Sequence, residues 1–522
     1  VDLSTGDRVA HFAEIDANIT EGDFSDQALI LRPAARLRGG GHYGVAIRSS
    51  LRDKAGVPIA RSAAFAALVD GGSTGSARLD AQRTAYTSLF AQLATAGIPT
   101  GDLTLAWDFH VADDASLIAT QLAVRDAALA TVGDGSAVPL TIELDEAPDS
   151  RDPTIARRMH IAYESPRVVG TNFAGFLRDG NGQPAPQGTS TAVASILVPP
   201  CATAANPAKL VMYGHGFFGD YDESEAGYAR RFANETCSVI IGGVWRGMST
   251  ANVGDAALAL NELGRIPGFS AGVWQGIIDF MVLAKMAKTQ LATEVLVDGN
   301  GDSIVDATRV HYYGISQGHI LGSTLLAFDP TMERAAFNVG GANWSMMFER
   351  SKNWLLYSQP LEGAYGSQLA ALIGMQVIEL SFELIDGGTV APLALAGQVP
   401  GAPAKQYLMQ ISRDDCQVPN MASAFHARSL GLPLLQPSVM PVFGLTEVAG
   451  PQASALVVYD EMLEPKPPAD NTTFGYDNDA HERTRQWSAT IEQINHFFDT
   501  GEIINTCDGA CDCAAGACGT RP

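Results

Sequence analysis

A serine between two glycines follows an expected strand and precedes an expected helix. Gly314-Ile-Ser-Gln-Gly318 comes directly after the strand Arg309–Tyr313, and the helix covers Gln317–Phe328. A sharp strand-to-helix turn leaves no room for large side chains beside the serine, so glycines there expose Ser316 Oγ. The N-terminus of the helix favours developing negative charge. The pattern predicts Ser316 as a nucleophile; the alternative is a serine in an ordinary tight turn.

A serine nucleophile needs a base, and the base needs an acid that orients it. The expected strand Gln406–Ile411 leads to Asp415, which begins an Asp-x-x-Val-Pro sequence ending at Pro419. Asp414 is the competing carboxylate, and a further alternative is that both residues only end the strand. We predict Asp415 as the acid because it lies just past its strand.

Three histidines follow this acid along the chain. His426 and His496 fall inside expected helices, where packing or surface roles are usual. His481 follows the strand Ala455–Tyr459 in a loop and directly precedes a helix beginning at Glu482. A loop histidine in this position can reach the end of the sheet, so we predict His481 as the general base.

A glycine-rich turn can supply the donors that bind a developing oxyanion. Gly214-His-Gly-Phe-Phe-Gly219 follows the expected strand Leu210–Tyr213. Its glycines let backbone N–H groups turn inward, and a hole needs such donors in place before charge develops. We expect the N–H of Phe217 and the N–H of Gln317, directly after the nucleophile, to bind the oxyanion.

These residues follow strands of one predicted sheet. The expected strands are Leu210–Tyr213, Ser238–Gly242, Arg309–Tyr313, Gln406–Ile411 and Ala455–Tyr459. The helical stretches between them include Ala226–Asn234, Gly272–Thr289 and Gln317–Phe328. Strands that alternate with helices predict a mostly parallel sheet covered on both faces.

The motifs at 214–219, 314–318, 415–419 and His481 together resemble α/β-hydrolase-fold esterases and lipases, over about residues 200–505. This resemblance implies an α/β-hydrolase fold, a mostly parallel sheet flanked by helices. The N-terminal stretch, with Tyr43–Arg48 and Leu105–Phe109, is similar to the domain that precedes the hydrolase in exported bacterial virulence-factor-type lipases. One departure is His319, where such relatives often carry a second glycine.

We divide the chain into a smaller α+β accessory domain over 1–150, a catalytic domain over 151–505 and a cysteine-rich tail over 506–522. Ser316 and Asp415 are further apart than a strand–helix–strand unit requires. The excess predicts a cap over about 344–400, with buried core helices as the alternative. We expect four side chains to bind substrate around the mouth of the site: His215, Trp245, His319 and Trp344.

An acidic loop precedes the nucleophile strand. Asp298, Asn300, Asp302 and Asp306, with the carbonyl of Ile304, match the oxygen spacing of a calcium loop. Position 6 is a serine rather than glycine and position 12 is an arginine rather than glutamate. The loop therefore predicts a structural Ca²⁺ bracing the strand, with a metal-free acidic turn as the alternative.

Composition excludes several classes of partner. The 34 basic and 57 acidic side chains give a net charge of −23, which repels nucleic acid and anionic membranes unless a basic patch is set apart, and none is present. No apolar run approaches the roughly 20 residues of a membrane span, so we expect no transmembrane segment. The motifs imply no organic cofactor.

The cysteines indicate export. Four of the seven, Cys507, Cys511, Cys513 and Cys518, crowd a polar tail that can form no core, which favours disulfides over a metal cluster. Because the total is odd, one thiol is free or pairs outside the chain. The sequence begins at Val1 without a signal peptide, so we expect a secreted or cell-envelope protein whose export signal was removed, or a trimmed chain.

These observations predict a secreted serine hydrolase that cleaves carboxylic esters of small-molecule, lipid or polymeric substrates. A peptidase or acyltransferase would use the same triad. A binding protein that keeps the fold without catalysis is the alternative from another class.

Overall fold

The computed structural model describes residues 1–19 and 24–522, and the chain separates into two compact units. The first comprises Val1–Ala13 and Leu31–Leu117. In it, strands β3 (His42–Arg48) and β4 (Leu103–His110) pair antiparallel. Helices α1 (Ala63–Asp70), α2 (Ala77–Ala81) and α3 (Arg83–Thr95) accompany them, and α1 and α3 bury Phe65, Leu89 and Leu93 against β4. This unit is the expected small α+β domain.

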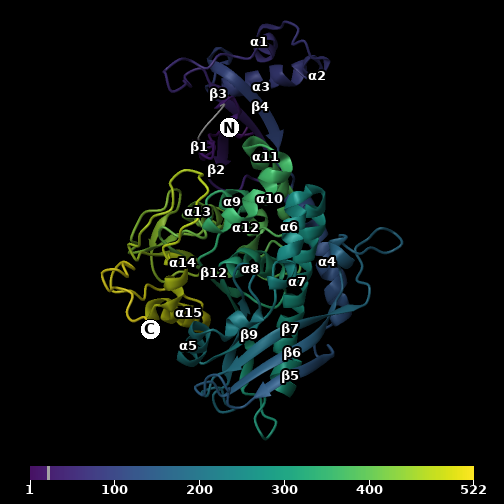
Figure 1. The fold of residues 1–522 in the computed structure, drawn as a ribbon, viewed down its shortest axis with the longest axis vertical. Helices are drawn as coiled ribbons and strands as arrows, with labels where there is room; N and C mark the ends of the chain where they lie inside the picture. The colour runs from purple at the N-terminus through teal and green to yellow at the C-terminus, as the bar shows by residue number, and fades with distance from the viewer. Residues whose placement is uncertain (20–23) are drawn as a thin grey trace. The chain divides into compact units, whose positions relative to one another are not determined.

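The larger unit comprises Glu14–Ile30 and Ile118–Pro522 and is organised around one sheet (Figure 1). Its eleven strands among the described residues run in the order β14-β13-β15-β12-β11-β10-β8-β9-β7-β6-β5. From β14 to β9 neighbouring strands are parallel, whereas β7, β6 and β5 continue the sheet antiparallel. In chain order the strands are β5 (Leu140–Glu146), β6 (Arg157–Pro166), β7 (Thr189–Val198), β8 (Ala208–Gly214), β9 (Ser238–Gly242), β10 (Val305–Ile315), β11 (Arg334–Asn338), β12 (Gln406–Ser412), β13 (Leu434–Gln436), β14 (Glu447–Ala449) and β15 (Ala455–Tyr459).

Alternating side chains of the central strands enter two separate cores. On β8, Leu210 and Met212 join one apolar cluster, while Val211 and Tyr213 join the other. Successive side chains of a strand point to opposite faces, so a sheet covered on both sides has apolar residues at every position. Helices α7 (Ile266–Lys288) and α8 (Gln317–Phe328) contribute to the first core, and α5 (Gly227–Thr236) and α15 (Ser488–Thr500) to the second.

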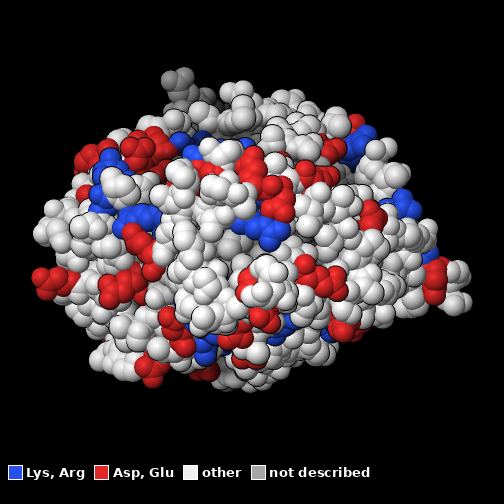
Figure 2. Space-filling view, turned by 90° about the horizontal axis from the view of Figure 1, so that it is seen from below, with Lys and Arg blue, Asp and Glu red and all other residues white. Residues whose placement is uncertain are grey.

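One helical segment, Leu263–Lys288, is long and apolar enough to cross a membrane by length and composition. Of its most apolar window, 89% is buried inside the protein, as in the core helix of a folded domain. A bent pair of helices, Gln368–Phe382 with Gly387–Ala394, meets the same test only when the two are taken together. On the face shown in Figure 2, acidic side chains are scattered among uncharged ones and basic side chains form no extended patch.

A single helical excursion leaves the sheet after β11 and returns at β12. It contains α9 (Trp344–Phe348), α10 (Leu355–Tyr365), α11 (Gln368–Phe382) and α12 (Gly387–Ala394). The excursion covers the range where we expect a cap, and within it α12 is largely buried in the core, as the alternative of core helices has it. A parallel neighbour strand can be reached only by a crossover, so the insertion lengthens a connection without disturbing the pairing of β11 with β12.

The first domain ends earlier than the expected boundary at residue 150. Helix α4 (Asp114–Val132) passes from the first unit to the second, and β5 pairs antiparallel with β6 at the edge of the large sheet. Short strands β1 (His11–Ile15) and β2 (Leu29–Pro33) pair with each other and also pass between the units. Segment 118–150 was misassigned because its hydrogen-bonding partner, β6, lies beyond the boundary.

The C-terminal tail carries two disulfides, Cys507–Cys511 and Cys513–Cys518, and a third joins Cys201 to Cys237. The tail is not detached from the catalytic unit. Asp460, directly after β15, accepts a hydrogen bond from Cys513 N at 2.8 Å and donates one through its own N–H to Cys511 O at 3.0 Å. The seventh cysteine, Cys416, is buried and unpaired.

This pairing predicts the result of alkylation without reductant. We expect the native protein to take up no label, because Cys416 is buried and burial raises the pKa of its thiol to about 11. After denaturation, mass spectrometry should find one adduct, on Cys416. Four alkylated tail cysteines in unreduced protein would contradict the two tail disulfides.

Candidate active site

Ser316 lies at a strained turn between β10 and α8. Its φ of 58° and ψ of −118° fall where a residue with a side chain rarely lies, which marks stored backbone strain. A Cβ at Gly314 would come within 2.2 Å of the Gly318 carbonyl oxygen, and one at Gly318 within 2.0 Å of the Gly214 oxygen. The two glycines are therefore required by close backbone approach, as the sequence predicted.

His481 and Asp415 form a buried hydrogen-bonded pair. His481 Nδ1 lies 2.7 Å from Asp415 Oδ2, and both side chains are 2% exposed. The other carboxylate oxygen, Oδ1, accepts the N–H groups of Gln417 at 2.7 Å and Val418 at 3.0 Å. Because the carboxylate accepts from Nδ1–H, Nε2 remains the basic nitrogen of the neutral ring. His481 lies on the short helix α14 (Ala480–Arg483), at its second residue.

The sheet brings the three residues to one edge. β10, β11, β12 and β15 are consecutive parallel neighbours, so the residues that follow them emerge at the same end. Ser316 N donates to Asn338 O at 3.0 Å, which fixes the serine to the end of the neighbouring strand. No hydrogen bond joins Ser316 to His481 within the described part of the chain. Such bonds are often long in a ligand-free site and tighten when substrate binds.

The competing residues are engaged elsewhere. Asp414 lies 3.7 Å from Arg413 and 3.8 Å from Lys466 in ion pairs, and its side chain is partly exposed. His426 lies on α13 (Asn420–Leu430) inside the core, where burial lowers its pKa to about 3. His496 lies on α15, a helix separate from the α14 that carries His481.

The turn after β8 is held in place before any ligand binds. Neither the Phe217 N–H nor the Gln317 N–H donates a hydrogen bond to another described residue, so both are available. Gly216 N donates to Glu223 Oε2 at 2.8 Å. The Gln317 side chain bridges two loops: its Oε1 accepts from Phe218 N at 3.2 Å and its Nε2 donates to Met248 O at 2.8 Å. These contacts provide the preorganisation that oxyanion binding requires.

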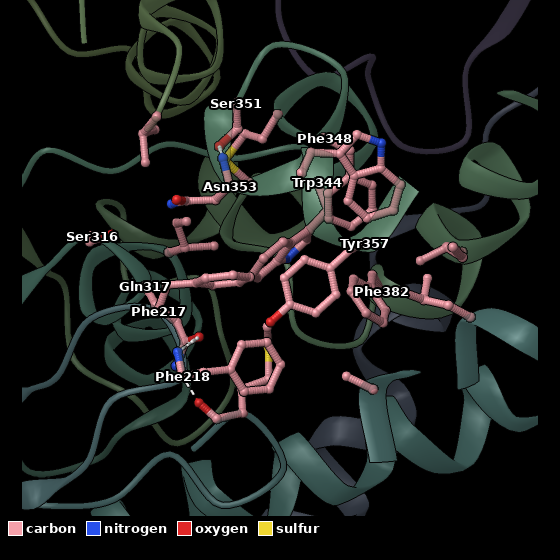
Figure 3. Close-up of a pocket in the computed structure, with 18 of the residues that line it drawn as sticks. Phe217, Phe218, Ser316, Gln317, Trp344, Phe348, Ser351, Asn353, Tyr357 and Phe382 are labelled. Carbon is pink, nitrogen blue, oxygen red and sulfur yellow. Dashed lines mark hydrogen bonds between the residues drawn. The ribbon is translucent and has the colours of Figure 1, made fainter. Parts of the chain in front are cut away.

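Ser316 opens into an apolar pocket roofed by the cap (Figure 3). The pocket holds about 780 Å³ of empty space, part of it open to solvent. Ser316 and Gln317 lie on one side, and Phe382 of α11 lies on the other. Tyr357 of α10 stacks on Phe218 with 5.8 Å between ring centroids, so the cap touches the glycine-rich turn. The aromatic lining residues are Phe217, Phe218, Phe269, Trp344, Phe348, Trp354, Tyr357 and Phe382.

Of the four expected substrate-binding residues, only Trp344 lines this pocket. The expectation was wrong for the other three, since their rings are fully buried. His215 donates from Nδ1 to Gly216 O and accepts at Nε2 from Trp245 N, so it braces the turn. Trp245 packs on Phe280, and His319 stacks on Phe337. The pocket residues that the sequence missed are mainly cap aromatics.

The side chains expected to bind calcium are not gathered around one point. In residues 1–19 and 24–522, no three carboxylate, imidazole or thiol groups lie where they could hold a metal ion. Asp298 Oδ1 instead accepts the N–H groups of Asn300 at 2.8 Å and Asp302 at 3.0 Å. The Ile304 carbonyl accepts from Ala208 N, and Asp306 caps Thr308. The calcium loop stays a prediction, with the acidic turn as its alternative.

A chelator separates the two interpretations. If the loop binds Ca²⁺, EDTA should lower the melting temperature, because the ion would brace the strand that carries Ser316, and Asp302→Ala should abolish this response. A melting temperature that EDTA does not change would leave the acidic turn.

The strand order and the turn at Ser316 decide the fold. The chain has an α/β-hydrolase fold. No family model matches the sequence, and no curated protein matches it. Solved structures with similar folds include acetyl xylan esterase 1 from Thermoanaerobacterium sp., at TM-score 0.40 and 10% identity, covering 67% of this chain and 89% of that one.

Two further solved structures also have similar folds. An S-formylglutathione hydrolase from Agrobacterium tumefaciens has TM-score 0.33 and 12% identity, covering 69% of this chain and 96% of that one. Carboxyl esterase 2 from Tuber melanosporum has TM-score 0.35 and 11% identity, covering 68% and 88%. Because these scores are low, the fold assignment rests on the chain's own topology. The resemblance of the N-terminal stretch to virulence-factor-type lipases stays a prediction.

Proposed function

We propose that this chain is a serine hydrolase that cleaves carboxylic esters through an acyl-enzyme. The observation that carries the proposal is the strained, glycine-flanked Ser316 at the wall of an apolar pocket, at the same sheet edge as a buried His481–Asp415 pair. A turn with a purely structural role would not require this strained backbone conformation, which costs about 1–3 kcal/mol.

In the proposed reaction, Ser316 Oγ attacks the ester carbonyl carbon while His481 Nε2 takes its proton. Asp415 holds the tautomer and stabilises the imidazolium. The N–H groups of Phe217 and Gln317 bind the tetrahedral oxyanion; losing one such donor costs about 3 kcal/mol of transition-state stabilisation. The imidazolium then protonates the departing alkoxide. Water, deprotonated by the same ring, releases the acid.

The pocket favours an apolar acyl or alcohol group. Its lining offers few polar side chains besides those at the reacting centre, namely Ser351, Asn353 and Gln417. The substrate in this proposal is a small-molecule, lipid or polymeric ester. Export is part of the proposal, because three disulfides are compatible with an oxidising compartment.

A fluorophosphonate probe tests the proposal. We expect one covalent adduct on Ser316, with turnover of p-nitrophenyl esters that Ser316→Ala abolishes. Hydrolysis of peptides alone would indicate a peptidase. Transfer of the acyl group to added alcohols in preference to water would indicate an acyltransferase. Folded wild-type protein that neither labels nor turns over any of these substrates would leave only the binding-protein alternative.

A further inference from the structure

A second cavity lies behind the apolar pocket. It holds about 1390 Å³ of empty space, part of it open to solvent, and its lining is much more polar, with Asp255, Arg265 and Asn172 among it. Three segments have one face on each cavity: α6 (Val253–Asn261), the start of α7 and the end of α11. The two cavities are therefore separated by a wall one helix thick.

Among the residues that the structure describes, Ala259 and Phe269 alone line both cavities. Phe269 is 4% exposed and lies between aromatic rings of the two sides. It stacks on Phe382 of the apolar pocket, with 6.1 Å between centroids, and meets the Phe173 ring of the second cavity edge-on, also at 6.1 Å. Phe382 lies across the pocket from Ser316 (Figure 3), so Phe269 closes the end remote from the nucleophile.

The wall is rigid around this ring. A Cβ at Gly272, one turn further along α7, would come within 2.1 Å of the Phe173 ring, and one at Gly268 within 2.0 Å of the Phe173 carbonyl oxygen. The segment around Phe173 thus packs directly on the α7 backbone. Phe269 therefore lies on a stretch of helix that packs closely against the segment around Phe173.

We propose that Phe269 sets the length of the chain that the apolar pocket accepts. This inference rests on the proposed ester hydrolysis at Ser316 and adds its specificity. A chain that reaches the ring can bury no further methylene, and each buried methylene is worth roughly fourfold in affinity. Beyond the ring, the second cavity offers space that the native pocket does not use.

The test compares kcat/KM for p-nitrophenyl butanoate and dodecanoate in four proteins. Phe269→Ala should raise the dodecanoate-to-butanoate ratio by at least about tenfold, since several methylenes then enter the second cavity. Ile378→Ala is the matched control: it enlarges the apolar pocket from α11 without opening the wall, and its ratio should stay near that of wild type.

Refilling the second cavity provides the reverse experiment. Ser381 lines only that cavity, so Phe269→Ala combined with Ser381→Trp should return the ratio toward the wild-type value. If Phe269→Ala does not fold, Phe269→Leu supplies a smaller opening with the same direction of change. A labelled, active variant whose ratio does not move would overturn the inference, as would an equal rise in Ile378→Ala. A wild-type protein without Ser316 labelling would instead refute the proposed function itself.

Discussion

His481→Ala should lower kcat about 10⁴-fold or more while the protein stays folded. The variant loses the base that activates Ser316 and the acid that protonates the leaving group in one step. The fold should survive, because the Asp415 carboxylate keeps the N–H groups of Gln417 and Val418 as partners after the imidazole is removed. Steady-state kinetics on a short p-nitrophenyl ester, with circular dichroism for the fold, measure both effects.

His496→Ala is the control for this variant. His496 lies on α15, away from the sheet edge, so kcat should stay within about twofold of wild type and only stability should change. Activity that survives at 481 and disappears at 496 would contradict the assignment of the base.

Asp415→Asn should lower kcat by about 10⁴-fold with little change in KM. The substitution keeps the shape of the side chain and can retain an oxygen for the two backbone N–H groups. Its amide, however, can donate to Nδ1, which places the ring proton on Nε2 and removes the base. The free energy of unfolding should fall by only about 1–3 kcal/mol, the usual cost of weakening one charged hydrogen bond.

Asp414→Asn separates the two neighbouring carboxylates. Asp414 forms only partly exposed ion pairs with Arg413 and Lys466, which contribute little to stability. We expect its kcat to match wild type. Equal losses in the two variants would mean that the turn, rather than the Asp415–His481 bond, supports activity.

The central strands could be predicted from local composition. Residues 238–242 and 455–459 are largely apolar and contain Val-Ile-Ile and Val-Val between turns, and the structure has strands with these bounds. β11 was not among the expected strands because Arg-Ala-Ala-Phe-Asn contains no β-branched residue. It is a strand because β10 and β12 pair with it on both sides. The pairing of two distant segments cannot be predicted from the sequence of either segment alone.

In the candidate site, too, local sequence predicts some residues and not others. Ser316 and Asp415 lie at turns directly after strands, where local spacing carries information, whereas His481 lies on the short helix α14. Whether a residue binds substrate depends on the direction of its side chain, and distant contacts determine that direction. His215 accepts a hydrogen bond from the Trp245 backbone, and His319 faces His426. The wall at Phe269 involves α6, α7 and α11, and no single sequence window contains it.

The helical excursion between β11 and β12 has a consequence for how such a protein can diversify. It supplies much of the pocket lining, including Trp344, Phe348 and Phe382, yet none of the residues proposed to make or break bonds. Its ends join strands that are already paired, and it touches the Asp415 turn through Lys352 N, which donates to Cys416 O, so changes that keep this contact leave the reacting groups where they are. Selection can therefore change which substrates the pocket binds without first losing the residues proposed to react.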